Sequence, residues 1–367
     1  MILDRLELFN FKSYGHQDLE LAPGMNLVTG RNAQGKTNLL EAIYFVSHLK
    51  SNRTPRLREL IREGEENASV RVLIMDEGTK ATISIAFGVS GKSVEVNGRK
   101  MQASRALGLL KCVMFEPGDL YLVKGEPSRR REFLDETLEE LGQHAARPVE
   151  AYKRVLRQRN ALLKRWEDYG AGFRAALEPW SEKLAEEGGV LAVARERMTE
   201  SMSRMINETH SEISGQDVKI GFEYRGTFGL GAASPEEAAS RMRGELARRI
   251  ADEKRARSTL VGPHRDDVEI RIGGREARYT ASQGEQRTLA FAMRLAQRGY
   301  VSDETGKEPI LLLDDVLSEL DEERRARVLG VVGRSGQSIV TATEPPEAGG
   351  VPASRILVVE GGTVRVG

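Results

Sequence analysis

The hydrophobic positions of the first 122 residues predict a strand-rich region built around one helix. Residues 82–87 alternate polar and apolar side chains, which is the period of a half-buried strand. Asn97-Gly98 separates two further short runs and favours a two-residue hairpin turn. Between residues 37 and 49 the apolar positions instead recur near helical spacing. The predicted strands are 3–9, 18–21, 25–29, 70–75, 82–87, 93–96 and 100–103, and the predicted helix is 37–49.

A different pattern begins at Pro127, where the chain becomes highly charged and its apolar residues follow helical periods. Residues 191–206 carry leucine, methionine and isoleucine at three- and four-residue steps, which is typical of core packing between antiparallel helices. Gly170–Gly172 and Gly188-Gly189 are expected to break these helices, leaving them too short for a long coiled coil. Ser234, followed by Pro235 and two glutamates, predicts the start of a helix that runs to about residue 258.

Strand patterns return after Gly262. Residues 268–272 and 275–279 flank Gly273-Gly274, which indicates a second hairpin, and residues 310–315 have the apolar run of a buried parallel strand. We therefore predict an α/β domain in two halves, residues 1–126 (with a β subdomain) and 259–367. A mainly helical domain, residues 127–258, is inserted between them.

Composition narrows the class of protein. The 367 residues include 55 Lys and Arg and 55 Asp and Glu, so binding to nucleic acid would need local basic patches rather than a global field. The single cysteine, Cys112, lies in an apolar run, which excludes an intrachain disulfide and favours a buried thiol in a reducing compartment. No signal peptide is evident, and no apolar stretch approaches the roughly 20 residues that span a bilayer. We expect a cytoplasmic protein without a membrane partner.

Residues 30–37, Gly-Arg-Asn-Ala-Gln-Gly-Lys-Thr, match the phosphate-binding P-loop pattern between a predicted strand and a predicted helix. In such a loop Lys36 would reach the β- and γ-phosphates of ATP, where it would also assist catalysis, and Thr37 would bind Mg²⁺. The predicted acidic partner is Asp314, which would bind Mg²⁺, with Asp315 orienting or deprotonating the attacking water. Two acids after four apolar residues fit a strand end that faces a ligand, although a solvated exit from the strand is the alternative.

Residues 282–288, Ser-Gln-Gly-Glu-Gln-Arg-Thr, precede a predicted helix at 289–297. Ser282 and Gly284 at a helix start could donate hydrogen bonds to an anion, or Ser282 could simply cap the helix. The residues alone leave these two interpretations open.

The order of these motifs resembles the ABC-type ATPases, and several segments are similar to the bacterial RecF family over essentially the whole chain. The family would make the fold an ABC/SMC-type P-loop ATPase head with an inserted helical domain. The segments that carry the resemblance are NFKSY (10–14), QGKTNLLEAI (34–43), RRREFLD (129–135), GPHRDD (262–267), SQGEQRT (282–288) and LDDVLSELD (313–321).

The resemblance implies a DNA repair protein that binds ATP and Mg²⁺ and uses weak ATP hydrolysis as a switch. ATP would join two copies into a dimer that clamps duplex or gapped DNA and, with RecO and RecR, promotes loading of RecA in recombination, replication and the SOS response to DNA damage. Each nucleotide would lie between the P-loop of one copy and the signature of the other. The implied nucleotide contacts are Lys12, Ser13, Gly30, Arg31, Asn32, Ala33, Gln34, Gly35, Lys36, Thr37, Asn38 and, across the dimer, Ser282, Gly284 and Gln286.

The chain departs from the family pattern in places. Position 33 is Ala where the loop often has Gly, and Asp315 stands where ABC transporters have Glu. No histidine follows the predicted strand at 338–341, so Thr343 or Glu344 occupies the place of the γ-phosphate sensor. The counterpart of the glutamine loop is expected near Glu116.

Basic residues that could bind DNA phosphates cluster in two places, after the P-loop helix and at the start of the helical region. Solvated helix faces balanced by nearby acids are the alternative interpretation, and nothing indicates base-specific readout. Two other functional classes compete with a RecF-like mediator: an SMC-type structural ATPase or nuclease partner, and an ABC transporter subunit. The candidate DNA contacts are Lys50, Arg53, Arg56, Arg129, Arg130 and Arg131.

Overall fold

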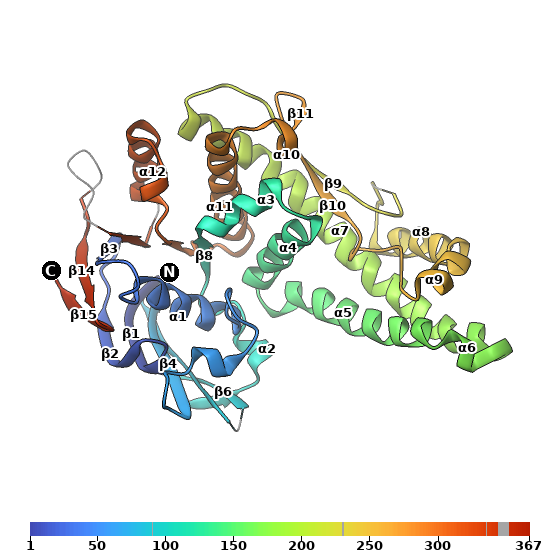
Figure 1. Ribbon diagram of the computed structural model, residues 1–367, viewed down its shortest axis with the longest axis horizontal. Helices are drawn as coiled ribbons and strands as arrows, with labels where there is room; N and C mark the ends of the chain where they lie inside the picture. The colour runs from blue at the N-terminus through green and yellow to red at the C-terminus, as the bar shows by residue number, and fades with distance from the viewer. Residues whose placement is uncertain (90, 230, 335, 344–351) are drawn as a thin grey trace.

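The structure, a computed structural model, describes residues 1–89, 91–229, 231–334, 336–343 and 352–367. Figure 1 shows two six-stranded sheets gathered at one end of the molecule and long helices extending from it toward the other. The first and last strands both lie at the sheet-rich end, so the chain leaves this end, builds the helical part and returns.

The sheet that carries the P-loop strand is mostly parallel, with one antiparallel edge. Its central strand is β3, which pairs on one side with β13 and on the other with β14. Strands from the two ends of the sequence therefore form one sheet. In spatial order they are β15 (Thr363–Val366), β14 (Arg355–Glu360), β3 (Met25–Thr29), β13 (Ser338–Ala342), β12 (Ile310–Leu313) and β8 (Cys112–Phe115).

Both faces of this sheet are covered, which explains why its strands are continuous apolar runs. In β12, Leu311 and Leu313 join the core formed with the long helices, whereas Ile310 and Leu312 join the core on the opposite face. The helix α1 (Lys36–His48) lies in that second core, between this sheet and the antiparallel sheet. The P-loop helix is thus held between two sheets and has little freedom to move as a separate unit.

The antiparallel sheet follows the order in which its strands occur, except that β1 lies between β2 and β4. Asn97 and Gly98 both have positive φ, 50° and 75°, as a type I′ hairpin requires, which confirms the predicted turn between β6 and β7. The strands are β1 (Ile2–Phe11), β2 (Tyr14–Glu20), β4 (Asn67–Asp76), β5 (Thr79–Gly88), β6 (Gly91–Val96) and β7 (Arg99–Met101).

The helical part contains one helix far longer than predicted. Helix α7 has 42 residues, and Gly188 and Gly189 lie inside it rather than ending it. Both glycines are buried against α8: a Cβ at Gly189 would lie 2.5 Å from the carbonyl oxygen of Pro235, and one at Gly188 would lie 2.6 Å from Met242 Sδ. The predicted break is therefore wrong, because these glycines allow two helices to approach closely. Helix α7 also packs on α5 and α11, and its methionines lie in the main core as predicted.

The helices of the chain range from single turns to α7, and the predicted helix from residue 235 to 258 is divided at Arg249. The cap at Ser234 is confirmed, since its side chain accepts a hydrogen bond from the Glu237 amide. The remaining helices are α2 (Ala103–Ala106), α3 (Leu120–Lys124), α4 (Pro127–Leu141), α5 (Gln143–Lys164), α6 (Trp166–Tyr169), α7 (Phe173–Ser214), α8 (Pro235–Arg248), α9 (Ile250–Ala256), α10 (Ala277–Thr280), α11 (Gln283–Thr305) and α12 (Glu322–Arg334), with 3-10 turns η1 (Leu57–Leu60), η2 (Pro117–Asp119), η3 (Gly170–Gly172) and η4 (Leu317–Glu319).

A small sheet joins the helical part to the rest. It contains β9 (Ile220–Arg225), β10 (Asp267–Ile272) and β11 (Arg275–Glu276), all antiparallel. The predicted strand at 275–279 is only two residues long, because the chain turns into α10 at Ala277. The predicted boundary between residues 258 and 259 separates the paired strands β9 and β10, so the three-part division stays a prediction.

Candidate nucleotide-binding site

The P-loop leaves β3 at Thr29 and enters α1 at Lys36 through a turn that needs unusual backbone angles. Gly30 and Gly35 have φ of 145° and 115°, and a Cβ on Gly30 would lie 2.4 Å from the carbonyl oxygen of Val359. Only glycine fits these two positions. Ala33 also has positive φ, 63°, which costs about 1–2 kcal/mol for a residue with a Cβ. This angle explains why glycine would suit position 33.

Lys36 folds back over the loop. Its Nζ donates hydrogen bonds to the carbonyl oxygens of Gly30 (2.5 Å) and Arg31 (3.1 Å). Burial lowers the pKa of Lys36, while the charges of Asp315 and Asp314 act in the opposite direction. The two acids from the far end of the sequence therefore lie close enough to affect the P-loop lysine.

Thr37 and Asp314 meet as predicted for a shared metal ion. Thr37 Oγ1 donates to Asp314 Oδ1 at 2.9 Å, although the two residues are 277 positions apart. Hydroxyl and carboxylate oxygens are ligands that Mg²⁺ prefers, and Asp314 is almost fully buried at the end of β12. The donor set fits Mg²⁺ with Thr37 and Asp314 as its protein ligands.

Arg53 occupies a place that the sequence did not indicate. Its Nη2 donates to Asp314 Oδ2 at 2.9 Å, so this arginine lies in the nucleotide site rather than on a separate surface patch. That Arg53 contacts DNA stays a prediction. A guanidinium beside the metal carboxylate supplies positive charge where phosphate oxygens are expected.

Thr341, at the end of β13, connects the two acids, and sequence reasoning missed it. Its hydroxyl donates to Asp314 Oδ1 (3.0 Å) and accepts a hydrogen bond from the Asp315 amide (2.8 Å). Strands β12 and β13 are parallel neighbours, so their carboxyl ends lie side by side. A polar residue at the end of an apolar strand next to β12 could therefore have been predicted to lie in the site. Thr343 is exposed, and Glu344 lies outside the described residues.

Asp315 has the marks of a reactive group. Its φ is 51°, a left-handed conformation that few residues other than glycine adopt, although aspartate adopts it more readily than most. Its Oδ1 is buried and has no hydrogen-bond partner among the residues that the structure describes. A carboxylate oxygen left without a donor beside Lys36 and Asp314 is suited to accept a hydrogen bond from a bound water.

The neighbours predicted near the nucleotide surround the P-loop. Ser13 Oγ accepts a hydrogen bond from Asn38 Nδ2 at 3.0 Å, and Lys12 lies 3.6 Å from Glu41 in an ion pair. Gln34 Oε1 accepts a hydrogen bond from the amide of Gly361, in the turn between β14 and β15. The last hairpin therefore braces the P-loop, a contact that no motif indicated.

The signature segment stands apart from these residues. Ser282 caps α11 and forms a capping box with Glu285, and the described residues show no hydrogen bond between positions 282–286 and the P-loop. Gln286 is mostly buried and donates its side-chain amide to the carbonyl oxygen of Ala281. The structure is compatible with both interpretations of Ser282, helix capping and binding of an anion. Its hydroxyl caps α11, and the residue is also exposed at the beginning of this long helix.

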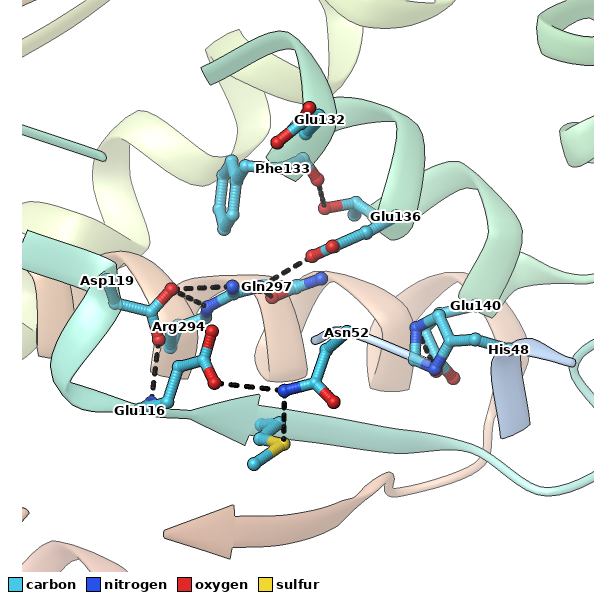
Figure 2. Close-up of polar contacts among 12 residues, drawn as sticks. His48, Asn52, Glu116, Asp119, Glu132, Phe133, Glu136, Glu140, Arg294 and Gln297 are labelled. Carbon is cyan, nitrogen blue, oxygen red and sulfur yellow. Dashed lines mark hydrogen bonds and ion pairs between the residues drawn. The ribbon is translucent and has the colours of Figure 1, made fainter. Parts of the chain in front are cut away.

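Glu116, the expected counterpart of the glutamine loop, follows β8 at the edge of the same site. Figure 2 shows its carboxylate accepting a hydrogen bond from Asn52 Nδ2 (2.9 Å), with Asp119 bound to its backbone amide. Its Oε2 lies 4.0 Å from Arg53 Nε. Burial, followed by the charge of Asp119, raises the pKa of Glu116. A cleft of about 670 Å³ opens beside these residues toward α4.

The other candidate DNA contacts have acidic neighbours of their own. Arg130 is buried in an ion pair with Asp267 (2.7 Å), so it is corrected from a surface contact to an internal one. Arg131 donates to a backbone oxygen, that of Asp266. The remaining ion pairs are Lys50–Glu139 (2.6 Å), Arg56–Glu59 (3.6 Å) and Arg129–Glu132 (3.3 Å).

Comparison with known proteins accounts for this arrangement. The family model "RecF/RecN/SMC N terminal domain" matches residues 2–351. The chain is 38% identical over 348 residues to the DNA replication and repair protein RecF of Symbiobacterium thermophilum, covering 94% of this chain and 92% of that protein. The chain belongs to the RecF family. The RecF protein of Acidothermus cellulolyticus is 37% identical and covers both chains completely.

Solved structures agree with this assignment. The recombination mediator protein RecF with ATP, from the RecFOR pathway, has a TM-score of 0.91 and 33% identity, covering 99% of this chain and 97% of that chain. The Smc head domain of Pyrococcus furiosus, 20% identical with a TM-score of 0.56, shares the fold. The RecF-family fold is thus an ABC/SMC-type ATPase head, as predicted. Among the described residues, no helix is long and apolar enough to cross a membrane.

Proposed function

We propose that this chain is an ATP-switched, DNA-binding protein of recombinational repair, and that ATP joins two copies of it. The observation that carries the proposal is that Thr37 pairs with Asp314, whereas the signature residues at the start of α11 stand apart from this pair. One copy supplies the P-loop, the metal ligands and Asp315. The second copy supplies Ser282, Gly284 and Gln286 to the same nucleotide.

In the ATP-bound state Lys36 exchanges its two backbone acceptors for phosphate oxygens. Its hydrogen bonds to Gly30 and Arg31 hold the ammonium group over the loop in advance, which limits the reorganisation on binding. Mg²⁺, held by Thr37 and Asp314, would neutralise charge on the phosphates when bound. Arg53 lies on the other oxygen of Asp314 and supports the same phosphate end.

Asp315 is proposed to hold the attacking water through its Oδ1, which has no hydrogen-bond partner among the described residues, while its backbone amide donates to the Thr341 hydroxyl and so holds the residue in place. A single acid with a constrained backbone supports slow hydrolysis, which suits a switch. Hydrolysis removes the γ-phosphate that both copies contact, so the dimer and its grip on DNA are released.

The proposed partners are duplex or gapped DNA and, from the likeness to RecF of the RecFOR pathway, RecR with RecO and RecA. An SMC-like structural ATPase is the second candidate. It would need a protruding helical arm, whereas α7 packs along α5, α8 and α11.

The test is sedimentation of the protein with ATP, ADP or no nucleotide, with and without duplex DNA. The parent protein should form a dimer only with ATP. Lys36→Met should lose ATP binding by more than about tenfold, because the lost charge-assisted hydrogen bonds exceed 1.4 kcal/mol.

Ser282→Arg serves as the matched variant, since it lies on a different element from the P-loop. It should bind ATP as the parent does but stay a monomer. A parent protein that stays monomeric at high ATP concentration would remove the two-copy mechanism, and unchanged ATP binding by Lys36→Met would remove the P-loop assignment.

A further inference from the structure

The GPHRDD segment (262–267) leads into β10 and contacts α4, α5 and α7. In Figure 1, β10 lies on the helical side of the molecule, away from the P-loop helix α1. The side chains of the segment belong to one connected network. His264 Nδ1 is 2.6 Å from the hydroxyl of Tyr152, and its Nε2 is 3.0 Å from the carbonyl oxygen of Thr259. Arg195 donates to the carbonyl oxygen of Pro263 at 2.8 Å. The segment thus ties two long helices to the small sheet.

Most arginines in this network have a carboxylate partner. The ion pairs are Arg130–Asp267 (2.7 Å), Arg159–Glu253 (2.6 Å) and Arg195–Asp135 (2.5 Å). These three arginines are buried. Their role is internal, because a buried guanidinium needs a counter-charge to be tolerated.

Arg131 and Arg265 are different. Arg131 donates to the carbonyl oxygen of Asp266 (2.8 Å) and Arg265 to that of Thr259 (3.3 Å). In the part of the chain that the structure describes, neither forms an ion pair with a carboxylate. Arg265 is exposed and Arg131 is half-buried, so both can be reached from solvent.

The nearby carboxylates are committed to other donors. Asp266 is fully buried, and its oxygens accept hydrogen bonds from the Tyr224 hydroxyl and from the amide and hydroxyl of Thr227. Both oxygens of Asp267 are bound by Arg130. The network therefore uses its acids internally and leaves two cations without counter-charge at its surface.

These two cations also lie close to one another and to a neutral ring. Burial lowers the pKa of Arg131, and the charges of Arg195 and Arg265 lower it further, although the charges of Asp267 and Asp266 act in the opposite direction. Burial likewise lowers the pKa of His264 to about 4, and Arg265 and Arg131 contribute in the same direction. Like charges that lie near one another without a carboxylate in direct ion-pair contact are suited to bind an anion.

We propose that Arg131 and Arg265 form a phosphate-binding pair for the sugar–phosphate backbone of DNA. The inference rests on the proposed DNA-binding function and adds the site to it. Guanidinium groups match phosphate oxygens with paired hydrogen bonds, and contacts to phosphate position a protein on DNA without reading its sequence. Arg131 is among the DNA contacts expected from the sequence, and Arg265 is added to them.

The test measures duplex DNA affinity with ATP over a series of salt concentrations. The proteins are the parent, Arg131→Gln, Arg265→Gln, the double variant and Arg265→Lys. Each lost phosphate contact should lower the slope of log K against log salt by about 0.9, so the double variant should lose about 1.8. Arg265→Lys should keep most of the parent's slope, since it keeps the charge.

The control is Arg248→Gln, because Arg248 is exposed on α8 and pairs with Glu245. It should leave the slope unchanged. A parent that binds DNA with the same slope as the double variant overturns the pair but leaves the proposed function standing. A parent that does not bind DNA with ATP overturns both.

A second arm uses inorganic phosphate to separate a backbone site from a small-anion site. Thermal unfolding of the parent and of the double variant is followed with and without phosphate, without nucleotide. If phosphate stabilises only the parent while both proteins bind DNA equally, the pair is a small-anion site and the proposal fails. Loss of DNA affinity in the double variant, with native circular dichroism, supports it.

Discussion

Two regions of the molecule gather arginines near acidic side chains, and they balance the charge in opposite ways. Around Arg294, on α11, one guanidinium meets two carboxylates: it donates to Asp119 at 2.6 Å and to Glu136 at 3.0 Å (Figure 2). Burial alone would lower the pKa of Arg294, but these carboxylates raise it well above its usual range. Around Arg131 and Arg265, by contrast, the carboxylates are bound elsewhere.

The comparison separates arginines that hold the fold from arginines that are available to a ligand. Arg294 connects the signature helix α11 to the turn after β8 and to α4, so its charge serves three elements at once. Among the described residues, the hydrogen bonds of Arg131 and Arg265 go to backbone oxygens, and neither arginine forms an ion pair with a carboxylate. The two regions differ in whether a carboxylate is available to pair with the arginine: Asp119 and Glu136 pair with Arg294, whereas Asp266 and Asp267 are bound by other donors.

The largest expected effect is on the Arg294 side. Arg294→Gln should lower the free energy of unfolding by about 3–5 kcal/mol, because it leaves Asp119 and Glu136 buried without their shared cation. Urea unfolding at neutral pH measures this. Arg294→Lys, which keeps the charge but cannot bind both acids through a planar group, should lie between the two proteins. A loss below about 1 kcal/mol for Arg294→Gln would mean that this cluster is not structural.

An intermediate effect concerns His264, which is surrounded by Tyr152, Thr259, Arg131, Arg159 and Arg265. The folded protein protonates this ring only near pH 4, whereas the unfolded chain does so near 6.5. The contribution of the neutral His264 ring to the free energy of unfolding is therefore fully present above pH 6.5 and is lost as the pH falls toward 4. Between pH 7 and pH 5 the free energy of unfolding should decrease by up to about 2 kcal/mol from this residue.

The measurement compares urea unfolding of the parent, His264→Gln and His144→Gln at both pH values. His264→Gln should show a smaller decrease than the parent, whatever its absolute stability. His144 is exposed on α5, so its variant should follow the parent. Equal decreases in the parent and in His264→Gln would show that the pKa of His264 is not lowered by folding.

The smallest expected effect sharpens the contrast with Arg294. Arg265→Gln should change the free energy of unfolding by less than about 0.5 kcal/mol in either direction, because it removes no ion pair and relieves like-charge repulsion. The same urea titration measures it. A loss comparable to that of Arg294→Gln would show that Arg265 is structural after all.

The fold and the centre of the site could be predicted because they depend on local patterns. The P-loop needs glycines at fixed places, and Asp314 ends an apolar strand, so both are visible in the sequence. Thr341 and the contact of Gly361 with Gln34 were not predictable in this way. They depend on which strands become neighbours, and no local pattern reports that.

Two features of the structure were not expected from the sequence, and each has a physical reason. Gly188 and Gly189 look like helix breakers, but their missing side chains make room for α8. Arg53 looks like one member of a basic surface cluster, but the turn after α1 brings it to Asp314. Backbone flexibility and charge can be read from the residue type. The structural role of a glycine or an arginine depends on which residues pack against it in the fold.

The position of β3 has a consequence for how the protein is made. Asn26 in this strand bonds to the carbonyl oxygen of Ser338 in β13, 312 residues later. At 5–20 residues per second, the ribosome would take roughly 15–60 s to produce that neighbour. During this time the strands β1, β2 and β4 to β7 can pair with one another. Strand β3 cannot, because both of its neighbours, β13 and β14, come near the end of the chain. The nascent chain therefore carries its P-loop strand without its two sheet partners through most of its own synthesis, with the backbone hydrogen-bonding groups of that strand unpaired.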